Sequence, residues 1–385
     1  MITIDLGPDG LDRGGHLLLR QGLRAHDRVA VVSEHHALGP HLRAWCRAQG
    51  HALTWPDVGA PVVARGPAAE GRWEGAEDTG PVEDHPPPRW GLAARGSTVE
   101  AGMEGFHFPL SDKREVWTED AARLYAVGAA NQWDPETAID WEAPFELPEA
   151  VEEAVVQVMT YLIENETAAL IVPAGFLARL HPHFREVMQV LALQAADEAR
   201  HVEVFTRRAL LRRPRLGLST VGGQRSLQTL IEEPDFALAS FLLAVLGEGS
   251  FLNLLGFLQR HAPDPVTRQV CRLAAQDEAR HVAFGMAHLS RHAREDPGLL
   301  GRLATAVTRR HAALSHTAGL NEEVYDALIL LAAGRWSRDA LARGFDAVVA
   351  LKEEMDAGRR GRLRQLGFSE AEARALSALH TRNFM

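Results

Sequence analysis

The chain has 385 residues, of which 46% are hydrophobic and 24% are charged, and its formal net charge is −10. This composition is that of a globular protein of two or three domains, and the acidic balance argues against a nucleic-acid-binding protein. The only two cysteines, Cys46 and Cys271, are too far apart in sequence and too few for a disulfide framework or a cysteine-ligated metal cluster. The first ten residues, MITIDLGPDG, lack the basic and apolar regions of a signal peptide, so we expect a cytoplasmic protein.

The N-terminal part alternates between strand and helix patterns. Short apolar runs and amphipathic segments predict the order strand, helix, strand, helix, strand, strand over 2–6, 16–26, 27–34, 37–51, 52–56 and 89–96. The segment 57–88 is rich in Gly, Pro, Glu and Asp and ends in three prolines, so we predict a disordered insertion there. Residues 1–97 are therefore expected to form a small α+β domain, followed by a linker over 98–118.

From residue 119 onward the pattern is helical, and we expect one helical domain over 119–385. Its first helices are predicted between proline start and stop signals over 119–133, 149–172, 183–211, 236–261 and 264–293. Three or four accessory helices are expected over 298–380, beside a bundle formed by 149–293. The segment 236–258 is long enough to span a bilayer, but Glu248 lies near its middle, and we interpret it as a helix buried in a protein core.

The sequence DEARHV occurs twice, at 197–202 and at 277–282, on the second and fourth long helices. Residues three positions apart share one face of a helix, so each copy presents a glutamate together with a histidine. A carboxylate and an imidazole on one face can supply two ligands to a metal ion. Two such helices that face each other are typical of a di-metal carboxylate bundle.

Such a bundle needs two further carboxylates, one from each of the other two long helices. Glu248 is the only acidic residue of 236–261 and stands among apolar residues, where an unpartnered carboxylate is costly. In 149–172, Glu166 continues the apolar stripe, whereas Glu164 continues a more polar one. We therefore prefer Glu166 and keep Glu164 as the alternative.

The spacing of these residues indicates two related halves. Glu166 precedes Glu198 by 32 residues, and Glu248 precedes Glu278 by 30. Four carboxylates balance the charge of two divalent ions, and mixed carboxylate and imidazole ligation suits iron and also admits manganese. The sequence therefore predicts a di-metal centre with six ligands: Glu166, Glu198, His201, Glu248, Glu278 and His281.

Each copy of the motif also carries an aspartate directly before its glutamate. Ligating histidines normally donate their second N–H to a carboxylate or carbonyl. We expect Asp197 to orient His281, and Asp277 to orient His201, across the helix pair, with surface ion pairs as the alternative for both aspartates. The arginines of the two copies are expected to pair with these aspartates: Arg200 and Arg280.

Other residues near the motif receive plainer interpretations. Glu203 is expected to form a solvated salt bridge, and His288 to fill core or surface space. An arginine cluster is expected to interact with a helix dipole, with a docking patch for an acidic partner as the alternative: Arg207, Arg208, Arg212, Arg213 and Arg215. A substrate pocket is expected beside the ligands, lined by residues that core packing would explain equally well: Phe205, Phe251, Leu252 and Phe284.

With these motifs, the chain resembles the ferritin-like carboxylate-bridged di-iron proteins over roughly 119–293. The doubled DEARH is most similar to bacterial multicomponent monooxygenase hydroxylases and to ribonucleotide reductase small subunits. The resemblance implies two iron ions, Fe/Fe or Mn/Fe, that activate dioxygen and oxidise a small organic substrate. The chain departs from the reductase pattern because Phe205 stands where a radical tyrosine is expected, and Tyr161 is a weak substitute. It departs from the monooxygenases because 250–252 holds no threonine.

Two glycines, Gly247 and Gly249, flank Glu248 and permit a local helical bulge. No flavin or nicotinamide motif is present, so an external electron donor is expected, and a homodimer is the default assembly. The predicted function is an oxygen-activating non-haem di-iron oxidoreductase: a hydroxylase, desaturase or N-oxygenase. The alternatives are a ferritin-like metal-binding or iron-oxidising protein without an organic substrate, and a metal-free scaffold.

The first domain resembles the TusA-type sulfur-carrier fold through GLDRGGHLLLR, DRVAVVSEHHALGPHLRAWCRAQGHAL and PRWGLAARG. The Cys-Pro-x-Pro of that family is replaced here by the four residues 13–16, which contain no cysteine. Cys46 matches a second, non-catalytic position of the family. The resemblance therefore implies docking, dimerisation or covering of the bundle, and no sulfur transfer.

Overall fold

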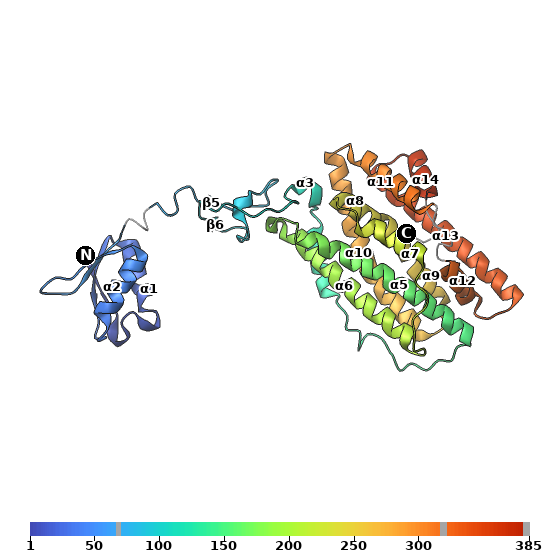
Figure 1. Ribbon diagram of the computed structural model, residues 1–385, viewed down its shortest axis with the longest axis horizontal. Coiled ribbons are helices and arrows are strands. Elements are labelled where there is room, and N and C mark those ends of the chain that lie inside the picture. Colours follow the sequence, from blue (N-terminus) through green and yellow to red (C-terminus); the bar gives the residue numbers. More distant parts are fainter. Residues whose placement is uncertain (67–70, 316–321, 380–385) are drawn as a thin grey trace. The chain divides into compact units, whose positions relative to one another are not determined.

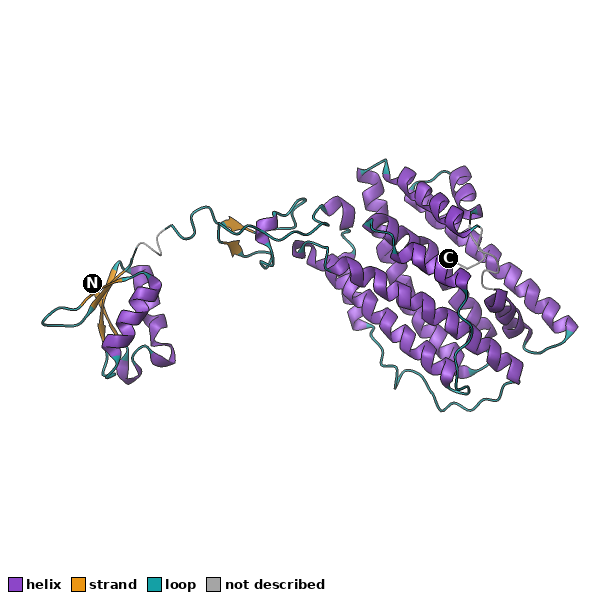
Figure 2. Ribbon diagram, viewed as in Figure 1, coloured by secondary structure: helices purple, strands orange, loops and turns teal. Residues whose placement is uncertain are grey.

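The computed structural model describes residues 1–66, 71–315 and 322–379. The protein is mainly helical, as expected, and the chain divides into two compact units (Figures 1 and 2). One unit contains Met1–Pro81 and Ala93–Gly105, and the other contains Val82–Leu92 and the residues from Phe106 onward.

The first unit contains a four-stranded sheet with the strand order β1–β2–β4–β3. β1 and β2 run parallel, whereas β4 is antiparallel to both of its neighbours. Leucines spaced four residues apart on α1 and α2 are buried: Leu19, Leu23, Leu38 and Leu42. The elements are β1 (Ile2–Asp5), α1 (Gly15–Ala25), β2 (Arg28–Val32), α2 (Leu38–Gln49), β3 (Ala52–Thr54), β4 (Val62–Ala64), β5 (Glu77–Asp78) and β6 (Thr98–Val99).

The last strand of this sheet is not where the sequence placed it. β4 lies within 57–88, where we predicted only a disordered insertion, and it is held because Val63 is fully buried between β2 and β3. The described segment 89–96 contains no strand. A short 3-10 turn at Pro88–Trp90 and the left-handed backbone of Gly91 (φ 49°) interrupt the extended conformation there.

The second unit is built around long helices, of which α5 pairs with α6 and α9 pairs with α10. The segment from α8 to α9 is continuous through a π-helix, and α7 was not expected from the sequence. The helices are α3 (Lys113–Val116), α4 (Ala121–Ala130), α5 (Glu149–Leu177), α6 (Arg185–Leu210), α7 (Val221–Ile231), α8 (Phe236–Ser240), the π-helix (Phe241–Glu248), α9 (Gly249–His261), α10 (Pro265–Glu295), α11 (Leu299–Leu314), α12 (Glu322–Ala333), α13 (Arg338–Leu366) and α14 (Glu370–Ala378).

Two segments, Glu149–Leu177 and Phe236–His261, are long and apolar enough to cross a membrane by length and composition. In the structure, 67% of the most apolar window of the first and 78% of that of the second are buried inside the protein. An apolar helix that is covered by other helices buries its apolar surface within the protein. Both segments are therefore accounted for as core helices of the bundle.

The helical bulge that the glycines around Glu248 permit is present as the π-helix, which ends at Glu248. A π-turn leaves carbonyl groups without their usual α-helical partners. Arg362 Nε donates to the backbone oxygen of Val245 at 2.7 Å and so satisfies one of them. A Cβ atom at Gly249 would lie 2.4 Å from this guanidinium, so glycine is the residue that admits the arginine.

A buried ion network ties α5, α6 and the start of α10 together. The fully buried Arg208 guanidinium donates to both carboxylate oxygens of Glu152, at 2.7 and 3.0 Å, and to Asp264 Oδ2 at 2.8 Å. It also donates to Thr267 Oγ1 at 2.8 Å. The prediction of a helix-dipole or docking role is thus wrong for Arg208. It lies two turns after His201 on the same inward face of α6, which is why it is buried.

Another buried group, His288 on α10, makes stability depend on pH. Its Nε2–H donates to the backbone oxygen of Glu115 at 2.6 Å. Burial, with help from His292 and Arg291, lowers the pKa of His288 from 6.5 to about 3. The neutral ring therefore contributes stability that is fully present above pH 6.5 and is lost progressively as the pH falls toward 3.

We expect this loss to disappear when His288 is replaced by glutamine, which can still donate to the same carbonyl. Between about pH 6 and pH 4, the free energy of unfolding should fall by about 1.4 kcal/mol per pH unit more in the wild type than in His288→Gln. Urea titrations at several pH values measure both slopes. Equal slopes would show that His288 does not stay neutral in the folded protein.

Candidate metal centre

The six residues predicted as metal ligands lie together in the helical unit, and all are buried. They form two groups of four whose potential ligand atoms lie within 4.8 Å of one another. One group contains Glu166 and His201, and the other contains Glu248 and His281. Both groups include the same two carboxylates: Glu198 and Glu278. The arrangement thus offers two adjacent metal positions with two carboxylates common to both.

Helix geometry explains how these side chains meet. α6 and α10 each present a glutamate and a histidine, three residues apart, on one face. Glu166 on α5 and Glu248 at the end of the π-helix supply the remaining carboxylates, one to each group. Glu164, the alternative on α5, is half-buried and belongs to neither group.

Several buried atoms of this cluster have no hydrogen-bond partner: Glu166 Oε1, Glu198 Oε1, Glu248 Oε2, both carboxylate oxygens of Glu278, and His281 Nδ1. His281 Nδ1 lies only 3.0 Å from Glu198 Oε1, so a proton on the imidazole or a bound cation must lie between the two atoms. Buried lone pairs this close repel one another unless a cation lies among them. Four carboxylates and two imidazoles therefore fit a pair of divalent metal ions.

The pKa shifts in the cluster also favour the binding of metal ions. Burial and the shared carboxylates raise the pKa of Glu166 and Glu248. Burial acts in the same direction on Glu198, but the two imidazoles outweigh it and lower its pKa. Burial alone would lower the pKa of His201 and His281, but the surrounding carboxylates raise it. The metal-free cluster thus holds excess negative charge, and metal ions would replace the protons that compensate it.

Two aspartates contact the histidines across the helix pair. His201 Nε2 lies 3.2 Å from Asp277 Oδ2, and His281 Nε2 lies 3.2 Å from Asp197 Oδ2, so both predicted contacts are present. Burial opposes ionisation of these aspartates, but the facing imidazoles outweigh it and lower the pKa of both. An ionised carboxylate accepts the Nε2–H, which leaves Nδ1 of each ring directed at the glutamates.

The two motif arginines pair with these aspartates, as expected, and each of them bridges both. Arg200 Nη2 donates to Asp197 Oδ1 at 2.6 Å and to Asp277 Oδ2 at 2.7 Å. Arg280 Nη2 donates to Asp197 Oδ2 at 3.2 Å and also to Asp277 Oδ1. The two guanidinium groups thus neutralise the two aspartates and hold them in one closed network.

Three polar side chains near the cluster were not anticipated. Gln132 donates to the aspartate of the first motif copy and Trp133 to that of the second, each at 2.8 Å. Gln194 Nε2 donates to Glu248 Oε1 at 2.8 Å. Gln194 lies one turn before Glu198 on the inward face of α6, and this periodicity could have identified it. Residues 132 and 133 follow α4 in an irregular segment, where no pattern marks them.

The four apolar residues expected to line a substrate pocket do not meet in one cluster. Phe205 and Phe251 belong to one buried apolar cluster, whereas Phe284 belongs to another, and Leu252 is half-buried. Phe284 lines a cavity of about 20 Å³ together with Gln194. This cavity is large enough for a water molecule but not for an organic substrate.

The cross-helix aspartates should support metal binding. Replacing Asp277 by asparagine keeps the shape but removes the charge that fixes the His201 tautomer. We expect metal affinity to fall about 10- to 100-fold. Competition with a chelator measures the change. The matched control is Glu203→Gln, an exposed position on α6, which should leave affinity unchanged. Equal affinities for the Asp277 variant and the wild type would contradict this role.

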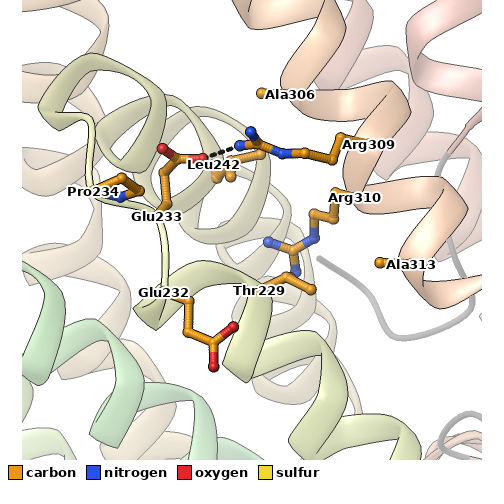
Figure 3. A pocket seen from close by; sticks show the side chains of 9 residues that line it. All are labelled: Thr229, Glu232, Glu233, Pro234, Leu242, Ala306, Arg309, Arg310 and Ala313. Carbon is orange, nitrogen blue, oxygen red and sulfur yellow. Dashed lines mark hydrogen bonds and ion pairs between the residues drawn. The ribbon is translucent and has the colours of Figure 1, made fainter.

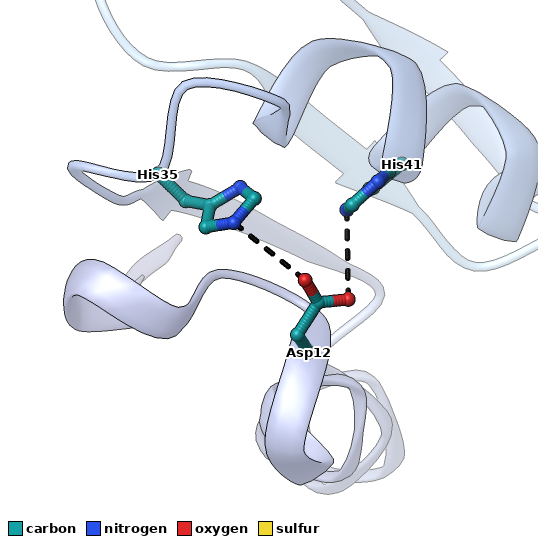
Figure 4. Close-up of side chains that lie close together, drawn as sticks. All are labelled: Asp12, His35 and His41. Carbon is teal, nitrogen blue, oxygen red and sulfur yellow. Dashed lines mark ion pairs between the residues drawn. The ribbon is translucent and has the colours of Figure 1, made fainter.

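A third group of potential ligands lies in the first unit and consists of Asp12, His35 and His41 (Figure 4). The Asp12 carboxylate lies 3.6 Å from His35 Nε2 and 3.7 Å from His41 Nδ1. However, His35 Nδ1 accepts the backbone N–H of Ala37 at 3.2 Å, so the ring proton of the neutral histidine belongs on Nε2. A protonated Nε2 donates to Asp12 and cannot bind a metal, which favours a polar contact that supports the turn.

No family model matches the chain, and no curated protein sequence matches it. The chain is similar to two solved structures of R2-like ligand-binding oxidase variants, one with a Mn/Fe and one with an Fe/Fe cofactor. Each alignment has 17% sequence identity and a TM-score of 0.52, and it spans 66% of the present chain and 95% of the neighbour's chain. A third variant with a Mn/Fe cofactor has 18% identity and a TM-score of 0.52, covering 66% and 98%. The protein thus has the ferritin-like fold of the R2-like oxidases.

This likeness does not identify the first unit, and its resemblance to TusA-type carriers stays a prediction. The strand–helix–strand–helix–strand–strand order is present, but its last strand is β4 and not the segment PRWGLAARG on which the resemblance partly rests. Cys46 is buried, and burial raises the pKa of its thiol to about 11. The thiol is therefore protonated at neutral pH, which does not favour sulfur chemistry at this position.

Proposed function

We propose that the protein is an oxygen-activating non-haem di-iron oxidoreductase that acts on a small organic substrate. The observation that carries this proposal is the pair of buried ligand groups that share Glu198 and Glu278. The structural neighbours, which are oxidases with Fe/Fe or Mn/Fe cofactors, support the same class and the same choice of metals.

Bound iron would supply the electrons that reduce dioxygen, and the protein residues would arrange the surroundings of that reaction. Asp197 and Asp277 hold the Nε2–H of the facing histidines, so that Nδ1 of each ring points at the carboxylates. All six proposed ligands are buried, which keeps bulk water away from the reacting centre. Because no cofactor motif is present, the electrons for repeated turnover would come from a separate donor.

The two metal positions would have different surroundings. Glu248 ends the π-helix and its Oε1 accepts an N–H from Gln194, whereas Glu166 lies within the long helix α5. The carboxylate at the π-helix is therefore the better candidate to move during the reaction. Phe205 is packed beside His201, with ring centroids 6.3 Å apart, so no radical tyrosine stands there. This argues against a ribonucleotide reductase role.

Reconstitution of the metal-free protein with ferrous iron tests the proposal. We expect dioxygen uptake that depends on the loaded metal and, with a chemical reductant and a panel of small organic acids and hydrocarbons, incorporation of isotopically labelled oxygen or desaturation of one compound. Sustained iron oxidation without oxidation of any organic compound would favour the iron-handling alternative. Failure to bind iron at all would leave only a scaffold role.

A further inference from the structure

A cavity of about 260 Å³ lies in the helical unit outside the ligand cluster (Figure 3). Its lining comes from α7, the turn before α8, the π-helix and α11: Thr229, Glu232, Glu233, Pro234, Leu242, Ala306, Arg309, Arg310 and Ala313. The volume is close to the lower end of the range for small-molecule sites, roughly 300–1,000 Å³. None of the six proposed metal ligands lines it.

Arg310 is the unusual member of this lining. The residue is only 9% exposed, and its Nη2 donates to Ser226 Oγ at 2.8 Å. No carboxylate among the described residues forms an ion pair with it. Burial lowers the pKa of Arg310 to about 10, so it still carries its charge at neutral pH. A buried guanidinium without a counter-ion is costly, in contrast to Arg208, which holds two carboxylates.

The other charges at the cavity do not compensate Arg310. The buried carboxylate of Glu233 is already paired with Arg309, as the dashed line in Figure 3 shows. Glu232 is exposed and accepts an N–H from Gln228 at 2.6 Å. Of the two arginines that line the cavity, only Arg310 therefore lacks a carboxylate partner among the described residues.

We propose that this cavity binds a small organic acid whose carboxylate pairs with Arg310 and whose apolar part lies against Leu242 and Ala306. A guanidinium presents N–H groups in a planar fork that matches a carboxylate with two parallel hydrogen bonds. The leucine, alanine and proline residues of the lining suit a hydrocarbon portion, and the carboxylates of Glu232 and Glu233 are already held by Gln228 and Arg309. This site is independent of the proposed metal chemistry and goes beyond it.

The cavity also touches the π-helix, which carries one of the proposed ligands. Leu242 lines the cavity, and Glu248 is the last residue of the same π-helix. An acid bound at Arg310 would thus lie against the helix that positions Glu248.

Calorimetric titration of the full-length chain with hexanoate, octanoate and benzoate, and with the matching uncharged amides, tests the proposal. We expect at least one acid to bind and its amide not to bind. In Arg310→Gln the affinity for that acid should fall more than about tenfold, whereas Arg310→Lys should retain part of it. Ala313→Phe should also weaken binding, because it narrows the cavity at an exposed position without touching the guanidinium.

The matched control is Arg359→Gln. Arg359 is also a buried guanidinium held by serine hydroxyls, those of Ser250 and Ser377, but it does not line this cavity. Its replacement should leave acid binding within a factor of about two. The proposal is overturned if no acid binds the wild type, if Arg310→Gln binds as tightly, or if inorganic phosphate binds as well as any of the acids. If Arg310→Gln does not fold, the lysine and Ala313 variants decide.

Discussion

Glu198→Ala should abolish metal loading at both positions, because this carboxylate belongs to both ligand groups. Its loss removes one ligand from each metal and one of the four negative charges that attract the pair. We expect less than one metal ion per chain after loading with ferrous iron, together with the loss of dioxygen uptake. Metal analysis and an oxygen electrode measure the two effects.

The same substitution should also destabilise the metal-free protein. The two imidazoles hold Glu198 ionised, and its removal leaves them without this buried partner. We therefore expect a melting temperature below that of the metal-free wild type, and no increase when iron is added. Glu203→Ala, exposed on the same helix, is the control and should behave as the wild type throughout. Full loading of the Glu198 variant would refute the shared-ligand arrangement.

Arg208→Ala should cause a large loss of stability although it lies outside the metal centre. It would leave the buried carboxylates of Glu152 and Asp264 without their counter-ion. We expect the free energy of unfolding to fall by about 3–5 kcal/mol. Urea denaturation of the metal-free proteins measures this fall without a contribution from bound metal.

The neighbouring Arg207 provides the control, because its side chain is 34% exposed and pairs with the exposed Glu136. Arg207→Ala should cost less than about 1 kcal/mol. A second comparison separates charge burial from packing. Replacing Arg208 together with its two acidic partners by apolar residues of similar volume should recover much of the lost stability. A loss below 1 kcal/mol for Arg208→Ala alone would mean that water reaches the network.

The proposed ligand cluster could be predicted from the sequence because it depends on regular helix periodicity. Glu198 and His201 share a face wherever the helix lies, and the duplicated motif specifies a second face of the same kind. The contacts that the sequence did not predict depend on how irregular segments pack. Gln132 and Trp133 reach the aspartates from a stretch without a repeat, and nothing in their spacing indicates this contact.

The first unit shows the same limit on a smaller scale. Its helices and first strands follow clear apolar patterns, whereas β4 has only three residues and lies in a segment rich in turn-forming residues. Pairing with two neighbouring strands stabilises it, and that contribution depends on tertiary contacts alone. The position of Arg208, two turns after His201, indicates that it is buried, whereas the charge of an arginine is typical of a surface residue.

The π-helix sets where this part of the chain tolerates a change in length. A π-turn accommodates one residue more than the α-helical repeat, and each residue of an α-helix turns the chain by about 100°. Deleting one residue from 241–247 would therefore be absorbed by loss of the bulge, and the residues on both sides would keep their faces. The same deletion within 250–260 of α9 has no bulge to absorb it, and it would turn the remainder of α9 by that angle relative to Glu248.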